Sequence, residues 1–148
     1  MTRVLAIASG GGHWVQLQRL RPAFTDQDVA FATVSAMYRG DVGDARFYVV
    51  PDATAWDRRE LIKLAFAVLS VLLRERPRVV ISTGAAPGFF AVVLGKMLGA
   101  RTIWIDSMAN VEEISRSARL VRRFADLWLT QWPHLAREDG PEYRGAVL

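Results

Sequence analysis

Cysteine is absent from this sequence of 148 residues, and histidine occurs only twice. Without cysteine the chain has no disulfide framework, no thiolate metal ligand and no thiol nucleophile. His13 and His134 lie far apart and form no cluster with the spacing of metal ligands, which argues against structural zinc. We expect no metal site and no cofactor.

No apolar run is long enough to cross a bilayer. The longest, Leu61 to Leu73, has thirteen residues, interrupted only by Lys63 and Ser70, whereas a spanning helix needs about 20. Met1-Thr2-Arg3 leads directly into a strand-like segment without a small-residue cleavage site, so no signal peptide is predicted. We expect the chain to stay in the cytosol.

Lysine is scarce, since Lys63 and Lys96 are the only lysines, and arginine supplies the rest of the basic residues. The formal net charge of +4 and the pI of about 10.1 indicate an anionic partner, such as a membrane surface, a phosphate or nucleic acid. The arginines fit phosphate recognition or reflect a GC-rich genome. Of these partners we expect the membrane surface and phosphate groups, and no nucleic acid.

The composition, 51% hydrophobic and 23% charged, is that of one globular domain over residues 1–148. Short apolar runs bounded by glycine, proline or polar residues predict parallel strands at Arg3–Ala8, Val29–Val34, Phe47–Val50, Val79–Ser82, Thr102–Ile105 and Leu127–Thr130. Segments with helical patterns separate most of them, so the fold class is α/β. We predict a Rossmann-like parallel sheet of about six strands with helices on both faces.

The segments between and after the predicted strands are expected to form helices, a loop and a tail. Val15–Phe24 is expected to form a first helix with an apolar stripe of Val15, Leu17, Leu20 and Phe24, and Ser35–Asp44 a polar loop. Phe89–Leu98 is expected to form a helix that ends at Gly99, a residue typical of the position after a helix. The tail, Glu142–Leu148, looks like a strand or arm whose partner lies elsewhere.

Three loops follow predicted strands and carry the residues with chemical potential: Ser9–His13, Ser82–Gly88 and Asp106–Asn110. Because the carboxyl ends of parallel strands meet at one edge of the sheet, one composite site is expected there. Consecutive glycines allow backbone N–H groups to approach a ligand closely. His13, directly after them, is suited to proton transfer near neutral pH. The alternative is a tight strand-to-helix turn capped by a histidine.

The apolar segment Leu61–Leu73 is flanked by arginines on both sides. One face of such a helix packs on the sheet, but a helix that is apolar nearly all round must bury its other face as well. A bilayer interface or a partner protein would cover it. The predicted membrane contacts are Arg59, Phe66, Leu69, Leu73 and Arg74. The arginines at 116, 119, 122 and 123 form either a solvated helix face or a contact to phosphate or anionic lipid.

Several motifs together resemble a known family. They are Ser9-Gly10-Gly11-Gly12-His13, Ile81-Ser82-Thr83-Gly84-Ala85, Gly95–Ala100, Trp104-Ile105-Asp106-Ser107, Ala125-Asp126-Leu127, Thr130-Gln131-Trp132 and Tyr143-Arg144-Gly145. In this order the set resembles the membrane-anchor subunit of the eukaryotic dolichol-linked N-acetylglucosamine transferase. It is more similar to that subunit's bacterial relatives in exopolysaccharide and capsule synthesis. The resemblance spans essentially the whole chain.

The resemblance implies one half of a split enzyme. Such chains are similar to the N-terminal half of a GT-B glycosyltransferase, which contacts the membrane and a polyprenyl-diphosphate-linked saccharide. A separate donor-binding subunit then holds most of the UDP-sugar site. Bacterial members are assigned to the transfer of glucuronic acid, and the eukaryotic ones transfer N-acetylglucosamine. Two departures from the family are expected to matter: we expect no counterpart of the eukaryotic N-terminal membrane helix, and Asp106 stands where many relatives have Glu.

An inverting transfer needs a base for the acceptor hydroxyl and stabilisation of the leaving diphosphate. We predict His13 as that base or as a diphosphate contact; Asp106 is the rival base, or otherwise a structural hydrogen-bond acceptor. The predicted substrate-binding residues are Gly10, Gly11, Gly12, Thr83, Gly84, Asn110, Glu112 and Glu113. We expect His134 at the surface and Trp128, Trp132 and Tyr143 in the core or a subunit interface.

Two other functions compete with the glycosyltransferase subunit. One is a stand-alone dinucleotide-binding module, but Val15 stands where the third fingerprint glycine belongs. The acidic residue expected at the end of the second strand is also replaced, by Val34 and Ser35. The other is a membrane scaffold that recruits a catalytic subunit and carries out no chemistry.

Overall fold

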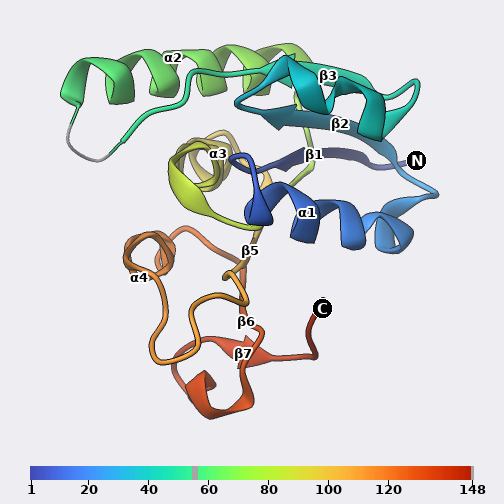
Figure 1. Cartoon of the computed structure of the whole chain (residues 1–148). Coiled ribbons are helices and arrows are strands. Elements are labelled where there is room, and N and C mark those ends of the chain that lie inside the picture. The colour runs from blue at the N-terminus through green and yellow to red at the C-terminus, as the bar shows by residue number, and fades with distance from the viewer. Residues whose placement is uncertain (55–56, 148) are drawn as a thin grey trace.

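The computed structural model describes residues 1–54 and 57–147, and a parallel β-sheet runs through it (Figure 1). Its strand order is β3-β2-β1-β4-β5-β6-β7. The strands are β1 (Arg3–Ile7), β2 (Asp28–Thr33), β3 (Arg46–Val49), β4 (Val79–Ser82), β5 (Arg101–Ile105), β6 (Leu127–Thr130) and β7 (Glu142–Tyr143). The predicted α/β class with a parallel sheet is confirmed.

The tail differs from its prediction. About six strands were predicted, and β7 is a seventh, which pairs in parallel with β6 through Leu129↔Glu142 and Thr130↔Tyr143. The tail strand therefore has its partner in the same chain, because β6 offers an unpaired edge. Leu148, the last residue of the predicted tail, lies outside the described residues.

The helices are α1 (Gly12–Arg19), α2 (Arg58–Glu75), α3 (Ala85–Met97) and α4 (Arg116–Val121), with 3₁₀ turns η1 (Arg21–Phe24), η2 (Ala36–Val42) and η3 (Pro133–Leu135). The predicted first helix is in fact two elements, since Pro22 lies in the first turn of η1. Val15, predicted in the apolar stripe, is 45% exposed, because Trp14 and Leu17 are the residues that α1 buries. The predicted polar loop 35–44 contains η2.

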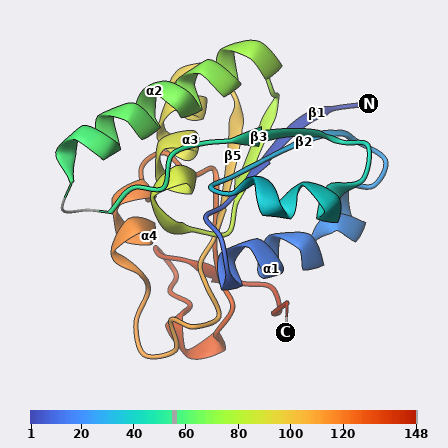
Figure 2. The same ribbon diagram turned by 45° about the horizontal axis from the view of Figure 1, so that its top comes forward.

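Helices cover the sheet on both faces (Figures 1 and 2). On one face Leu5 and Ile7 of β1 pack with Leu64 and Val68 of α2. On the other face Val4 and Ala6 pack with Trp14, Leu17 and Phe24 of α1 and η1. A further cluster joins α3, β5 and α4 through Val92, Trp104, Ala118 and Val121. Burial on both faces explains why the strands read as continuous apolar runs.

The strand order fixes the position of the site. β1 pairs with β2 on one side and with β4 on the other. The chain leaves β1 through α1 on one face and leaves β4 through α3 on the other face. The loops after β1 and β4 therefore diverge between these two strands, where ligands bind in open α/β sheets.

A buried carboxylate joins α2 to the opposite, amino-terminal edge of the sheet. Glu75 is 5% exposed and accepts hydrogen bonds from Arg46 Nε at 2.8 Å and from the Tyr48 hydroxyl at 2.5 Å. Arg46 also pairs with Asp28 at 2.9 Å. Burial alone raises the pKa of Glu75, but the hydrogen bonds from Arg46 and Tyr48 outweigh it and hold the pKa below its ordinary value.

We expect Glu75→Gln to lower the free energy of unfolding at neutral pH by about 2–3 kcal/mol, because Arg46 and Tyr48 lose a charged acceptor. A carboxylate with a lowered native pKa stabilises the fold above its unfolded pKa of about 4.3, and this contribution fades as the pH falls through the native pKa. Urea unfolding at a series of pH values should therefore show that the difference in unfolding free energy between Glu75→Gln and the unmodified chain shrinks below about pH 4. The matched control is Glu60→Gln, which removes an exposed pair with Lys63 and should change stability by less than about 1 kcal/mol. A difference constant with pH would contradict the assignment.

Candidate functional site

The three predicted loops meet at the carboxyl edge of the sheet around a pocket of about 230 Å³. Its lining comes from the α1, β4–α3 and β5–α4 regions: His13, Gly84, Ala85, Asp106, Ser107, Ala109, Asn110, Ser115 and Ser117. Of the predicted site residues, four therefore line this pocket together: His13, Gly84, Asp106 and Asn110. The predicted composite site has a physical counterpart in this pocket.

His13 lies in the first turn of α1, and its ring is held by the loop after β4. Its Nδ1 is 3.0 Å from the backbone oxygen of Thr83, and the Thr83 hydroxyl donates to the His13 backbone oxygen at 2.6 Å. A carbonyl oxygen only accepts, so the neutral ring carries its proton on Nδ1 and its lone pair on Nε2. This tautomer leaves Nε2 able to accept a proton from a ligand.

Gly84 allows the His13 ring to approach the backbone. A Cβ at this position would lie 2.8 Å from His13 Nδ1, and its φ of 133° is rarely adopted by other residues. Thr83 itself is fully buried. Thr83 and Gly84 therefore orient the histidine, although only Gly84 lines the pocket.

Asp106, directly after β5, is 2% exposed, and both of its carboxylate oxygens are engaged. One accepts from the Ser115 hydroxyl at 2.6 Å and from Trp104 Nε1 at 3.4 Å. The other accepts from the Ser115 backbone N–H at 2.8 Å and from Asn110 Nδ2 at 3.4 Å. Asp106 thus ties the two ends of the loop 107–115 together. This geometry favours a positioning role over that of a free base.

The glycine loop adjoins His13 but does not line the pocket. The Gly11 N–H donates to the Tyr38 hydroxyl at 2.9 Å, and Gly11 has a φ of 64°. α1 and α3 both have a glycine as the N-cap residue, with no side-chain cap, and neither has an acidic residue in its first turn. The positive ends of two helix dipoles therefore face this edge of the sheet, an arrangement suited to phosphate.

Glu112 and Glu113, predicted as substrate contacts, are exposed and lie outside the pocket lining. Glu113 pairs instead with Arg119 at 2.8 Å. His134 is exposed, as predicted. Within the described ranges no group of three or more His, Asp or Glu side chains is placed to hold a metal ion.

Two buried glutamines that were not among the predicted site residues support the site. Gln16 is 4% exposed; its Nε2 donates to the Ser107 hydroxyl at 3.2 Å, and its Oε1 accepts from the Met108 N–H at 3.1 Å. Gln131 donates to Gln16 Oε1 at 2.6 Å and to the Asp106 backbone oxygen at 3.0 Å. The position of Gln131 could have indicated a place near the site, since it follows the carboxyl end of a strand, as the site loops do.

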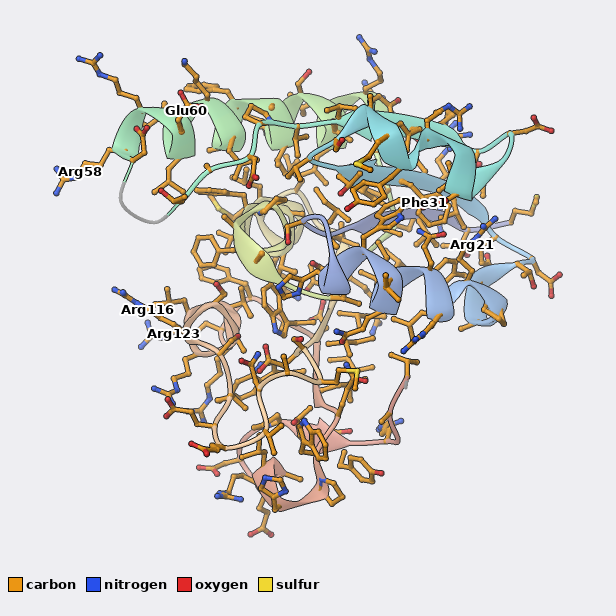
Figure 3. The ribbon with its side chains drawn as sticks, viewed as in Figure 1. Arg21, Phe31, Arg58, Glu60, Arg116 and Arg123 are labelled. Atoms are coloured by element: carbon orange, nitrogen blue, oxygen red, sulfur yellow. The ribbon has the colours of Figure 1, made fainter. Side chains whose placement is uncertain are left out.

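The outer face of α2 carries an apolar stripe. Ile62, Phe66 and Leu73 are 58%, 69% and 55% exposed. Leu69 is half-buried between them, and Leu64, Val68, Val71 and Leu72 face the core. Arg59 and Arg74 are exposed. In Figure 3 the side chains of Arg58 on α2, of Arg116 on α4 and of Arg123, which follows α4, project from the same side of the molecule.

None of the helices described here is both long and apolar enough to pass through a membrane.

The comparison with protein families agrees with the motifs. A family model described as "Oligosaccharide biosynthesis protein Alg14 like" matches residues 50–147, about two thirds of the chain. The chain belongs to this family. The predicted resemblance is thereby confirmed, while the glycine loop and His13 precede the residues that the Alg14-like model matches.

Curated members of the Alg14-like family match part of this chain. The "UDP-N-acetylglucosamine transferase subunit ALG14" of Yarrowia lipolytica is 29% identical over 93 residues, which cover 57% of this chain and 43% of that protein. The protein of the same name from Eremothecium gossypii is 32% identical over 93 residues, covering 53% and 41%. The chain thus spans less than half the length of these relatives.

Solved structures share the fold. MurG from Acinetobacter baumannii superposes with a TM-score of 0.78 at 11% identity, covering 97% of this chain and 45% of MurG. Staphylococcus aureus MnaA, in a co-structure with UDP, gives 0.70 at 11% identity, covering 99% and 46%. The predicted Rossmann-like architecture of the GT-B type is confirmed. The whole chain corresponds to a little under half of either protein.

Proposed function

We propose that this chain is the acceptor-binding subunit of an inverting glycosyltransferase that works with a donor-binding subunit on a separate chain. The observation that carries the proposal is the histidine held by Thr83 in a pocket at the diverging loops, in a chain equivalent to half of a MurG-sized protein. Half of such a fold supplies one wall of a cleft. The other wall, with the UDP-sugar, would come from the partner subunit.

The chemistry follows from the pocket. His13 Nε2 takes the proton of the acceptor hydroxyl as this oxygen attacks the anomeric carbon of the UDP-sugar, and the bond to UDP breaks with inversion. The open first turns of α1 and α3 stabilise diphosphate charge, with Gly10, Gly11 and Gly12 at the start of α1. Asn110 contacts sugar hydroxyls, while Glu112 and Glu113 would reach the substrate only from the rim.

The substrates are a UDP-sugar and a polyprenyl-diphosphate-linked saccharide of exopolysaccharide or capsule synthesis. The names of the curated relatives favour N-acetylglucosamine as the sugar, and glucuronic acid is the other candidate. The test is to co-express the chain with a donor-binding subunit encoded beside it and to supply phytanyl-diphosphate-linked sugar. Transfer from radiolabelled UDP-N-acetylglucosamine or UDP-glucuronic acid identifies the donor. Transfer by the donor-binding subunit alone would contradict the proposal.

We also propose that the chain binds peripherally to the inner face of the cell membrane through the outer stripe of α2. This stripe consists of Ile62, Phe66, Leu69 and Leu73, and exposed arginines lie at both ends of the helix. A surface helix of this kind lies in the bilayer interface with its apolar side chains among the acyl chains. A lipid-linked acceptor would then reach the pocket from the membrane surface.

Ile62→Glu/Phe66→Glu is expected to weaken binding to phosphatidylglycerol liposomes by about a hundredfold or more, because two apolar contacts are replaced by charges repelled by the lipid. Co-sedimentation measures the binding, and circular dichroism checks the fold. The matched control Val15→Glu/Met37→Glu adds the same charge on α1 and η2, at side chains that are 45% and 79% exposed over the opposite face of the sheet, and should bind as the unmodified chain does. Equal loss in both variants would mean that net charge alone drives binding.

A further inference from the structure

Two adjoining hollows lie at the amino edge of the sheet, the edge opposite the candidate site. The first, of about 290 Å³, lies between the C-terminal ends of α2 and α3 and is lined by Leu72, Leu73, Arg76, Pro77, Gly95, Leu98 and Ala100. The second, of about 560 Å³, is lined by Thr2, Pro77, Arg78, Val79, Leu98, Gly99 and Arg101. Pro77 and Leu98 line both, so the hollows form one continuous surface, at the end of the sheet where the N-terminus lies (Figure 1).

The first hollow is mostly apolar and lies where α2 and α3 end. α2 ends at Arg76 in the left-handed conformation, with φ 47°, and α3 ends before Gly99, with φ 91°. Gly95 lets α3 lie close to β4, since a Cβ there would be 2.9 Å from Val80. Leu73 and Leu98 are left 55% and 53% exposed at its rim.

The second hollow is positively charged. Arg78 and Arg101 line it, and Arg76 lines the first. Among residues 1–54 and 57–147, no carboxylate lines either hollow, and the guanidinium groups of these three arginines make no hydrogen bond or ion pair. By contrast, the neighbouring Arg3 pairs with Asp28 at 3.7 Å. Uncompensated arginines close together favour the binding of an anion.

We propose that this surface binds one anionic membrane phospholipid, with an acyl chain in the apolar hollow and the phosphate on Arg78 and Arg101. A hydrophilic anion would leave Leu73 and Leu98 in water, and a neutral apolar ligand would leave the arginines without a counter-charge. An amphipathic anion satisfies both. The proposal rests on the membrane contact of α2, because the apolar stripe ends at Leu73, which lines the apolar hollow.

The experiment uses monomeric short-chain lipids, so that lipid binding is separated from adhesion to a bilayer. Dihexanoylphosphatidylglycerol, below its micelle concentration, is titrated into the ¹⁵N-labelled chain. We expect saturable shifts of the Gly95, Gly99 and Ala100 amides, and affinity about tenfold or more above that for dihexanoylphosphatidylcholine. Equal affinity for the two lipids, or shifts confined to other residues, would overturn the proposal. So would equal shifts with inorganic phosphate, which has no acyl chain.

Substitutions of arginine then test the second, positively charged hollow. Arg78→Ser/Arg101→Ser should raise the Kd for dihexanoylphosphatidylglycerol by about tenfold or more. The matched control Arg19→Ser/Arg39→Ser removes the same charge from α1 and η2, which cover the other face of the sheet, and should leave the Kd unchanged. Equal weakening in both variants would mean that net charge, and not this site, binds the lipid.

The membrane contact of α2 and the phospholipid site can be tested independently of each other. Leu98→Asp should abolish binding of the monomeric lipid, and circular dichroism shows whether the variant folds. Phe66→Glu, on the α2 stripe outside both hollows, should lose liposome binding and keep the lipid-induced shifts. If Phe66→Glu keeps liposome binding while the shifts persist, the α2 contact fails and the lipid site stands. Unchanged lipid binding in a folded Leu98→Asp variant overturns the lipid site.

Discussion

Replacing His13 with Gln is expected to slow sugar transfer by about 10²- to 10⁴-fold, the usual contribution of a positioned general base. Glutamine keeps an N–H donor that can reach the Thr83 carbonyl, which the ring contacts at 3.0 Å, but it cannot take up a proton. Fold and membrane binding should therefore persist while chemistry is lost. The measurement is the initial rate of transfer to the phytanyl-diphosphate-linked acceptor by the complex of the two subunits.

His134→Gln is the matched control, because His134 is exposed and contacts the Val111 carbonyl outside the pocket. Its transfer rate should equal that of the unmodified complex. Liposome co-sedimentation of both variants should also be unchanged. A His13→Gln complex that transfers sugar at the normal rate would exclude a catalytic role for His13. If the Asp106 variant described below were equally active, the chain would act as a scaffold for its partner.

The strands were the most predictable part of the fold. β4 and β6 have the predicted bounds, because a strand buried on both faces is apolar along its whole length and its polar neighbours mark its ends. The tail was expected to be a strand or arm, but the pairing of β7 with β6 could not be predicted, since two exposed residues carry no periodic pattern and their pairing depends on where β6 exposes its edge. The orientation of α2 about its own axis was also not predictable, because apolar residues occupy both its faces. Leu69 is accordingly half-buried, less exposed than Ile62, Phe66 and Leu73 of the same stripe.

The sequence predicted which loops meet at the site, but it did not predict the contacts between their side chains. Parallel strands bring His13, Gly84 and Asp106 to one edge whatever the details of the loops. The roles of these residues depend on atoms that come from distant parts of the chain. Gln16 reaches Ser107 across 91 residues and Gln131 across 115, and no local pattern indicates such pairs. Asp106 was interpreted as a rival base because three of its four hydrogen-bond donors come from the following loop, whose path no local sequence pattern indicates.

Asp106→Ala is expected to lower the free energy of unfolding by about 3 kcal/mol and to reduce transfer strongly. The substitution leaves the buried donor of Trp104 and the half-buried donors of Ser115 and Asn110 without their acceptor, and the loss for a buried donor costs about 1–3 kcal/mol unless water replaces the acceptor. The loop 107–115, which forms one wall of the pocket, then loses the contact that closes it. Urea unfolding measures the first effect, and the transfer rate of the complex measures the second.

A double-mutant cycle with Ser115→Ala separates positioning from base catalysis. The Ser115 hydroxyl donates to Asp106 at 2.6 Å and accepts from the Ala118 N–H at 3.0 Å, at the start of α4. If Asp106 positions this loop, both single variants lose stability and activity, and their effects on stability are not additive, because they remove the same bond. If Asp106 is instead the base, Asp106→Ala abolishes transfer in a stable protein and Ser115→Ala has little effect. We expect the first outcome, because a carboxylate that already accepts four hydrogen bonds has little capacity left for the proton of an acceptor hydroxyl.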